Sequence, residues 1–149
     1  MLPRLKPPPL VLPPSAAVLA LIALAFIVPG LAGHDPWKTH DAIGVAIAHG
    51  MVTSGDALVP RVAGMPWLYD PPLYHWLAIA FGKLLQFVLE FHAGARLASG
   101  ALVLGAFSLI YLAARDWQAD EHKREAASAA FLLLLGCIGL IVHAHEALP

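Results

Sequence analysis

The sequence predicts an all-α polytopic membrane protein, with about three transmembrane helices and interfacial amphipathic helices in an outer loop. Of its 149 residues, 59% are hydrophobic and only 13% are charged, and the mean hydropathy of +0.71 lies well outside globular usage. Three long apolar stretches carry no charge, at 15–32, 97–114 and 126–142. Prolines concentrate in 3–14 and 29–72, where they indicate boundaries and a loop rather than helices.

The first segment, 1–14, is predicted to be a short basic cytoplasmic tail. It contains Arg4 and Lys6, and its run of three prolines favours an extended conformation. Residues 15–32 are then long and apolar enough for the first transmembrane helix. A signal peptide also has a basic start and an apolar core, but this core is long and lacks a convincing small-x-small cleavage site. We therefore favour an uncleaved span.

The next segment, 33–94, is predicted to be an outer loop with two interfacial helices. Thr39 can cap a helix near 39–53, in which Ile43 and Ile47 lie one turn apart. A second helix is expected near 73–91, where Lys83 interrupts an otherwise apolar stretch. A charge on one face fits an amphipathic helix on the membrane surface better than a span.

The remaining spans are predicted at 95–114 and 126–142, joined by a charged cytoplasmic loop at 115–125. This topology gathers the basic residues of tail and loop on one side, as cytoplasmic segments favour: Arg4, Lys6, Arg115, Lys123 and Arg124. Residues 143–149 then begin a second outer loop. We therefore expect His143, His145 and Glu146 to return to the face that carries Asp35 and Asp41.

Composition excludes several function classes. The formal charge of −1 and the pI near 6.7 give no basic excess for a nucleic-acid partner. Cys137 is the single cysteine, so an internal disulfide and a CxxC redox pair are excluded. P-loop, GxGxxG and GxSxG motifs are absent, which leaves soluble nucleotide and hydrolase chemistry without support.

Acidic residues shortly after the first span are the first candidates for chemistry. Asp35 and Asp41 lie at a membrane boundary, where carboxylates either face water in a loop or serve a purpose. Such a pair can bind a divalent cation or act as a general base for an acceptor hydroxyl or amine. The eight histidines include His143 and His145 beside Glu146, but this spacing is weak support for a metal-handling protein.

Three phrases in the outer loop resemble a known family. They are "DPWKTHDA" from Asp35, "SGDALVPRVAG" from Ser54 and "PWLYDPPLYHWLA" from Pro66. In this order and separation they are similar to the first outer loop of bacterial GT-C membrane glycosyltransferases, namely the lipid A aminoarabinose transferases and the protein mannosyltransferases. The resemblance runs from Asp35 to the end, since "ARLASGALVL" from Ala95 resembles the opening of the family's second span.

The resemblance implies a multi-pass protein of the bacterial inner membrane with its long loop on the outer side. Such an enzyme transfers a sugar, with inversion, from a polyprenyl-phosphate donor to a lipid or protein acceptor, with a divalent metal ion as a possible cofactor. On this match Asp35 and Asp41 are the expected catalytic residues. The expected substrate-binding residues are Lys38, His40, Arg61, Tyr74 and His75. The expected metal ligands are Asp41, His145 and Glu146.

Three departures from the family pattern bear on these expectations. Asp70 stands where the family has a lysine that faces the donor phosphate, and Ile43 replaces an arginine, so Lys38 and Arg61 are the expected substitutes. The chain is also far shorter than family members, so we expect an N-terminal part of a longer transferase, or a truncated product, without a complete active site of its own. The alternative is a non-catalytic small membrane protein that binds lipid carriers or partner helices.

Overall fold

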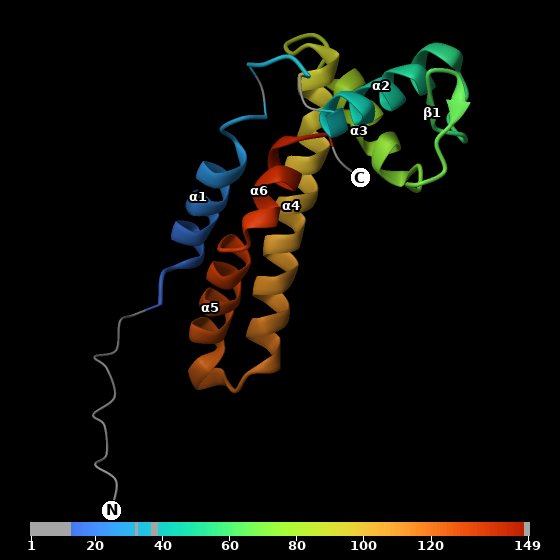
Figure 1. Cartoon of the computed structure of the whole chain (residues 1–149). Helices are drawn as coiled ribbons and strands as arrows, with labels where there is room; N and C mark the ends of the chain where they lie inside the picture. Colours follow the sequence, from blue (N-terminus) through green and yellow to red (C-terminus); the bar gives the residue numbers. More distant parts are fainter. Residues whose placement is uncertain (1–12, 32, 37–38, 148–149) are drawn as a thin grey trace, which may run out of the picture.

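The computed structural model describes residues 13–31, 33–36 and 39–147, and it is mostly helical. Figure 1 shows a long helix with other helices packed along its length and a smaller unit gathered around its beginning. The elements in chain order are α1 (Ala16–Ile27), α2 (Thr39–Ser54), β1 (Arg61–Val62), β2 (Met65–Pro66), α3 (Leu73–Leu84), α4 (Phe91–Trp117), the 3-10 helix η1 (Asp120–His122), α5 (Lys123–Leu135) and α6 (Ile138–His145). The predicted predominance of helices is thereby confirmed, and the small hairpin β1–β2 departs from an all-α fold.

Helix α4 is the axis of the molecule and contains the second predicted span. Among the described residues it is the one helix that is long and apolar enough to cross a membrane. Only 28% of its most apolar window is buried, whereas the core helix of a soluble protein is mostly buried. Its exposed apolar side chains, such as Leu109 at 69% exposure, therefore form an apolar outer surface whose contact with water is unfavourable.

The first and third predicted spans are shorter helices than expected. Helix α1 begins after Ser15, whose hydroxyl accepts a hydrogen bond from the Val18 N–H at 3.3 Å, and it ends at Ile27. The segment 126–142 is divided between α5 and α6, and the division falls at Gly136, a residue type that weakens helices. These helices pack along α4 on the side away from α3 (Figure 1).

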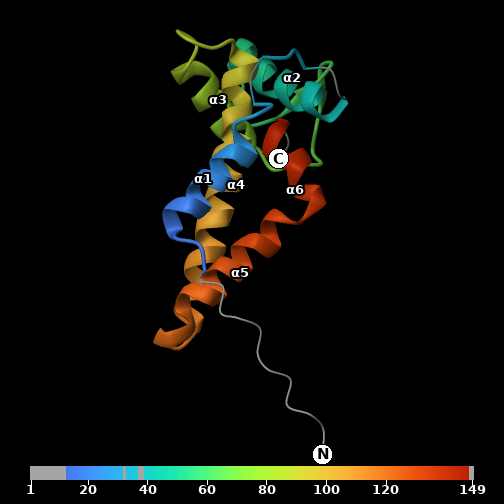
Figure 2. The ribbon, with the colours of Figure 1, turned by 90° about the vertical axis from the view of Figure 1, so that its left-hand side faces the viewer.

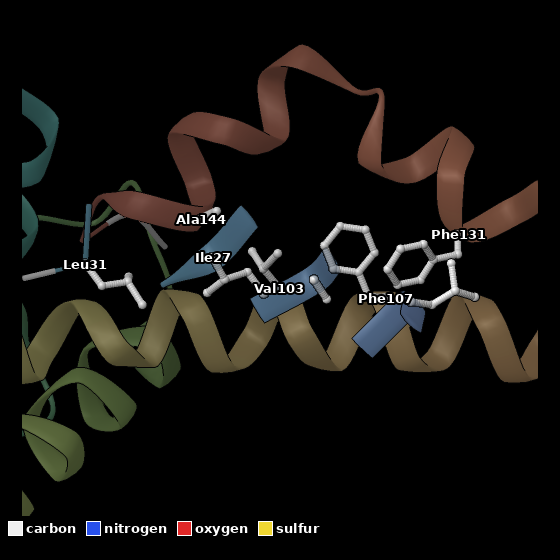
Figure 3. Packing of buried hydrophobic residues seen from close by; sticks show 8 residues of the cluster. Ile27, Leu31, Val103, Phe107, Phe131 and Ala144 are labelled. Carbon is white, nitrogen blue, oxygen red and sulfur yellow. The ribbon is translucent and has the colours of Figure 1, made fainter. Parts of the chain in front are cut away.

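An apolar core joins α1, α4, α5 and α6 (Figure 3). Toward one end of it, the ring of Phe107 has its centroid 4.7 Å from that of Phe131 and 6.1 Å from that of Phe26. Near the other end of this core, α4 presents Gly100, where a Cβ would lie 2.9 Å from Leu31 Cδ1. The buried members of this core are Leu19, Ala23, Ile27, Leu31, Val103, Phe107, Phe131 and Ala144.

The smaller unit consists of α2, α3 and the hairpin β1–β2. In the side view of Figure 2, α3 and α2 lie on either side of the first turns of α4. Helices α3 and α4 are close enough that a Cβ on Gly94 would lie 2.9 Å from the Cα of Gly82. The predicted helices near 39–53 and 73–91 are both present, but α3 ends at Leu84, and Glu90 occupies the N-cap position of α4 without a side-chain capping bond.

Candidate functional site

A buried arginine holds the smaller unit to α4. Arg96 has no exposed surface, and its guanidinium donates to Asp41 through Nε to Oδ1 at 3.1 Å and through Nη2 to Oδ2 at 2.7 Å. Its Nη1 donates to the carbonyl oxygen of His34 at 2.9 Å. This paired geometry is the strongest form of arginine–carboxylate contact. One side chain therefore connects α4, α2 and the segment 33–36.

Asp41 is saturated by these contacts. It is 1% exposed, and Oδ1 also accepts the N–H of Ala147 at 2.8 Å. Burial by itself would raise the pKa of this carboxyl, but the hydrogen bonds from Arg96 and Ala147 outweigh it and hold the pKa below 3.8. The sequence predicts Asp41 as a catalytic residue and metal ligand, whereas in the structure both of its carboxylate oxygens accept hydrogen bonds. Asp41 acts as an anchor for α2.

A second set of hydrogen bonds fixes the chain where it returns from α6. Ser99, one turn after Arg96 on α4, donates to the carbonyl oxygen of Glu146 at 2.6 Å, and Tyr74 donates to the Ser99 hydroxyl at 2.7 Å. Burial raises the pKa of Tyr74 to about 12, so its hydroxyl keeps its proton. These bonds and the one from Ala147 bring 146–147 to the end of the molecule that carries Asp41. That this end is the outer face of a membrane stays a prediction.

An open cavity of about 410 Å³ lies beside this buried cluster, between the segment 33–35 and the start of α4. Asp35, whose side chain is 94% exposed, and His92, whose side chain is 18% exposed, both line it. Asp35 Oδ1 lies 4.0 Å from His92 Nε2, and Glu90 Oε2 lies 3.4 Å from His92 Nδ1. Asp35, the other predicted catalytic acid, is thus accessible from solvent.

The remaining predicted site residues are dispersed. Lys38 lies outside the described residues, and His40 is exposed in the first turn of α2. Arg61 is about half exposed and pairs with Asp56 at 3.7 Å in the hairpin region. His145 has Nε2 2.8 Å from the carbonyl oxygen of Phe26. Where the structure describes the chain, the residues able to share a metal ion are Asp35, Glu90 and His92, a set other than the predicted one.

His75, also predicted to bind substrate, is buried next to Tyr74. It has no exposed surface, and neither ring nitrogen has a hydrogen-bond partner among the described residues. Burial lowers the pKa of His75 from its ordinary value of 6.5, against a smaller opposing effect of the Asp70 charge. The ring is therefore neutral at pH 7 and unavailable to a substrate in this conformation.

Replacing His75 is expected to make the protein less sensitive to acid. Between its lowered folded pKa and 6.5, the unfolded chain binds more protons, so the free energy of unfolding rises with pH up to about 6.5 and is flat above. His75→Leu removes this slope. It also removes an unpaired buried polar group, and such a group destabilises the folded protein by about 1–3 kcal/mol. Unfolding curves at pH 5 and pH 7.5 measure the difference, with exposed His122→Gln as the control. An equal pH slope in His75→Leu and wild type contradicts the expectation.

Four residues of this region are missed by sequence reasoning: Glu90, His92, Arg96 and Ser99. Sequence signals could have found two of them, Arg96 and Glu90. Arg96 is a charge in the first turns of an apolar helix, and charges within apolar spans usually have a specific partner. Glu90 directly precedes that helix, at the position where an acidic residue favours a helix N-terminus.

Comparison with known proteins adds no relative to this description. No family model, curated protein or solved structure matches this chain.

Proposed function

We propose that this chain forms the membrane-anchoring and outer-loop part of a glycosyltransferase that uses a polyprenyl-phosphate sugar donor at the outer face of the bacterial inner membrane. The observation that carries the proposal is the acidic cavity at the beginning of α4, the helix that could span a membrane. An accessible carboxylate at that position would meet a donor whose phosphate lies at the membrane surface and whose tail lies in the lipid.

The arrangement of the three family-like phrases supports the same proposal. The phrases beginning at Asp35, Ser54 and Pro66 include the start of α2, strand β1 and the first half of α3, elements that gather around the start of α4. Arg96 fixes the carbonyl of His34, and with it the position of the neighbouring Asp35. The resemblance in sequence thus corresponds to one compact unit beside the cavity.

Asp35 is the proposed general base. As the acceptor hydroxyl or amine bonds to the anomeric carbon of the sugar, its proton passes to the Asp35 carboxylate. The bond between that carbon and the phosphate oxygen breaks, and polyprenyl phosphate leaves with the electron pair. Attack opposite the leaving group inverts the anomeric configuration. The negative charge that develops on the phosphate needs a nearby cation, for which Lys38, three residues after Asp35 in the chain, is the proposed source.

Asp35→Asn is expected to lower sugar transfer by about 10²- to 10⁴-fold, the usual contribution of a general base. The assay uses the full-length protein in membranes, a polyprenyl-phosphate-linked sugar, and lipid A or a membrane protein fraction as acceptor. Asp116→Asn is the matched control, because Asp116 is an exposed aspartate at the far end of α4. Unchanged transfer by Asp35→Asn, or no transfer by the wild-type protein, contradicts the proposal.

One observation favours a second candidate, a non-catalytic protein that binds lipid carriers. An apolar groove of about 260 Å³ lies between α1 and α4, lined by residues such as Leu19, Leu104 and Tyr111. A groove of this composition suits a hydrocarbon chain. Under this second function the wild-type protein binds polyprenyl phosphate in membranes but transfers no sugar, and Asp35→Asn leaves that binding unchanged.

A further inference from the structure

We propose that Asp35, Glu90 and His92 form a binding site for a divalent transition-metal ion, with Zn²⁺ as the best fit. One ligand atom from each residue lies within 4.8 Å of the other two. Ligands of one tetrahedral zinc ion are about 2.0–2.2 Å from the metal and therefore about 3.3–3.6 Å apart. The ligand atoms must therefore approach one another by about 1 Å to surround one ion, a shift that side-chain rotation can supply.

The donor set distinguishes this group from an ordinary cluster of solvated acids. Its central member is an imidazole, which suits zinc and other transition ions, whereas Mg²⁺ and Ca²⁺ prefer oxygen ligands throughout. His92 is the least exposed of the three, at 18%, compared with 77% for Glu90 and 94% for Asp35. One ligand is thus held by its surroundings, and two flexible carboxylates can adjust to the ion.

The position of the three residues in the fold supports the same conclusion. Glu90 and His92 are at the start of α4, and Asp35 is brought to them across the chain by the bond from Arg96 to the His34 carbonyl. All three line the 410 Å³ cavity, which leaves space for water or a substrate oxygen on the open side of the ion. The ion takes one carboxylate oxygen of Asp35, and the other oxygen remains for the general-base role in the proposed function. Three protein ligands with an open fourth position are typical of catalytic rather than structural zinc.

The chain also offers a matched comparison at the opposite end of α4. His122 lies between two carboxylates as His92 does, with Nδ1 3.3 Å from Glu125 Oε2 and Nε2 3.8 Å from Glu121 Oε1. In the described part of the chain, the Asp35 group has ligand atoms that all lie within 4.8 Å of one another, and His122 with its two glutamates does not meet this criterion. His122 has the same chemistry on an exposed surface, so it controls for nonspecific zinc binding by a histidine between acids.

The test is a titration of the full-length protein in detergent with Zn²⁺, in the presence of millimolar Mg²⁺, followed by calorimetry. Wild type and His122→Ala are expected to bind one zinc ion with equal affinity. His92→Ala is expected to bind that ion at least about tenfold more weakly. Cobalt added in place of zinc gives a visible absorption spectrum that reports imidazole and carboxylate ligation in wild type only. Equal zinc affinity and equal cobalt spectra in wild type and His92→Ala overturn the proposal.

Asp35→Asn keeps the experiment decisive if His92→Ala unfolds, because Asp35 is exposed and its replacement leaves the core intact. This variant is expected to lose the same ion, and retention of full affinity overturns the site. Ion binding is measured without any sugar transfer, so the metal site and the proposed transferase function can fail independently of each other.

Discussion

Arg96→Ala is expected to destabilise the protein by about 3–5 kcal/mol, the usual cost of removing one partner of a buried ion pair. The variant leaves the Asp41 carboxylate buried without its cation and removes the donor that holds the His34 carbonyl. Arg96→Lys is expected to be intermediate, because an ammonium group cannot make the paired contact with both carboxylate oxygens. Unfolding in detergent, followed by circular dichroism, measures the loss.

A double variant distinguishes the effect of the buried charges on stability from the effect of side-chain packing at the same positions. Asp41→Leu combined with Arg96→Leu is expected to recover part of the stability lost in either single variant, because neither charge is then left buried alone. Arg61→Ala is the control, since the pair that Arg61 forms with Asp56 is largely exposed and contributes little. A loss in Arg96→Ala no larger than that in Arg61→Ala contradicts the buried anchor.

Gly44→Ala is expected to be almost as damaging, although alanine normally favours a helix over glycine. A Cβ at Gly44 would overlap the carbonyl oxygen of Ala147 and lie 2.9 Å from its carbonyl carbon. Because these are backbone atoms, the segment 146–147 must move, and the bonds from Ala147 to Asp41 and from Ser99 to Glu146 weaken with it. Overpacking of this kind costs about 1–3 kcal/mol, and the lost hydrogen bonds add to it.

The readout for Gly44→Ala is hydrogen exchange of the amides of 146 and 147 together with the free energy of unfolding. Gly105→Ala on α4 is the matched control, because a Cβ there meets no atom within 4 Å. That substitution is expected to stabilise the protein by up to about 1 kcal/mol. Equal stability of the two variants and unchanged exchange at Ala147 would show that the segment is not seated against α2.

Helical class and the approximate helix positions could be predicted because they depend on local patterns. Long apolar stretches with few charges predicted α1, α4 and the α5–α6 region, and Thr39 correctly predicted the start of α2. Gly136 is a local signal for the division of α5 from α6, but an apolar pattern alone marks neither that division nor the end of α3 at Leu84. Helix boundaries are the least reliable part of such a prediction.

The candidate site was predictable only in part. Asp35 stands out because an acid follows an apolar stretch, and the structure leaves it accessible in a cavity. Asp41 has the same signature in the sequence, yet Arg96, 55 residues later, takes both of its oxygens. Such a long-range pairing decides whether a carboxylate is free for chemistry or is part of the framework. Glu90 and His92, which lie close to Asp35 in the structure, could not be paired with Asp35 from their spacing in the sequence alone.

The length of α4 has a consequence for how the cavity would meet a lipid-linked substrate. A helix of 27 residues measures about 40 Å, whereas the hydrocarbon layer of a bilayer is about 30 Å thick. Where α4 crosses a bilayer, its first turns therefore stand at the depth of the lipid headgroups. A substrate carried on a lipid would arrive there by lateral diffusion, already at the right height. Turnover would then follow the mole fraction of the carrier in the membrane, and diluting it with inert lipid at constant total amount would slow the reaction.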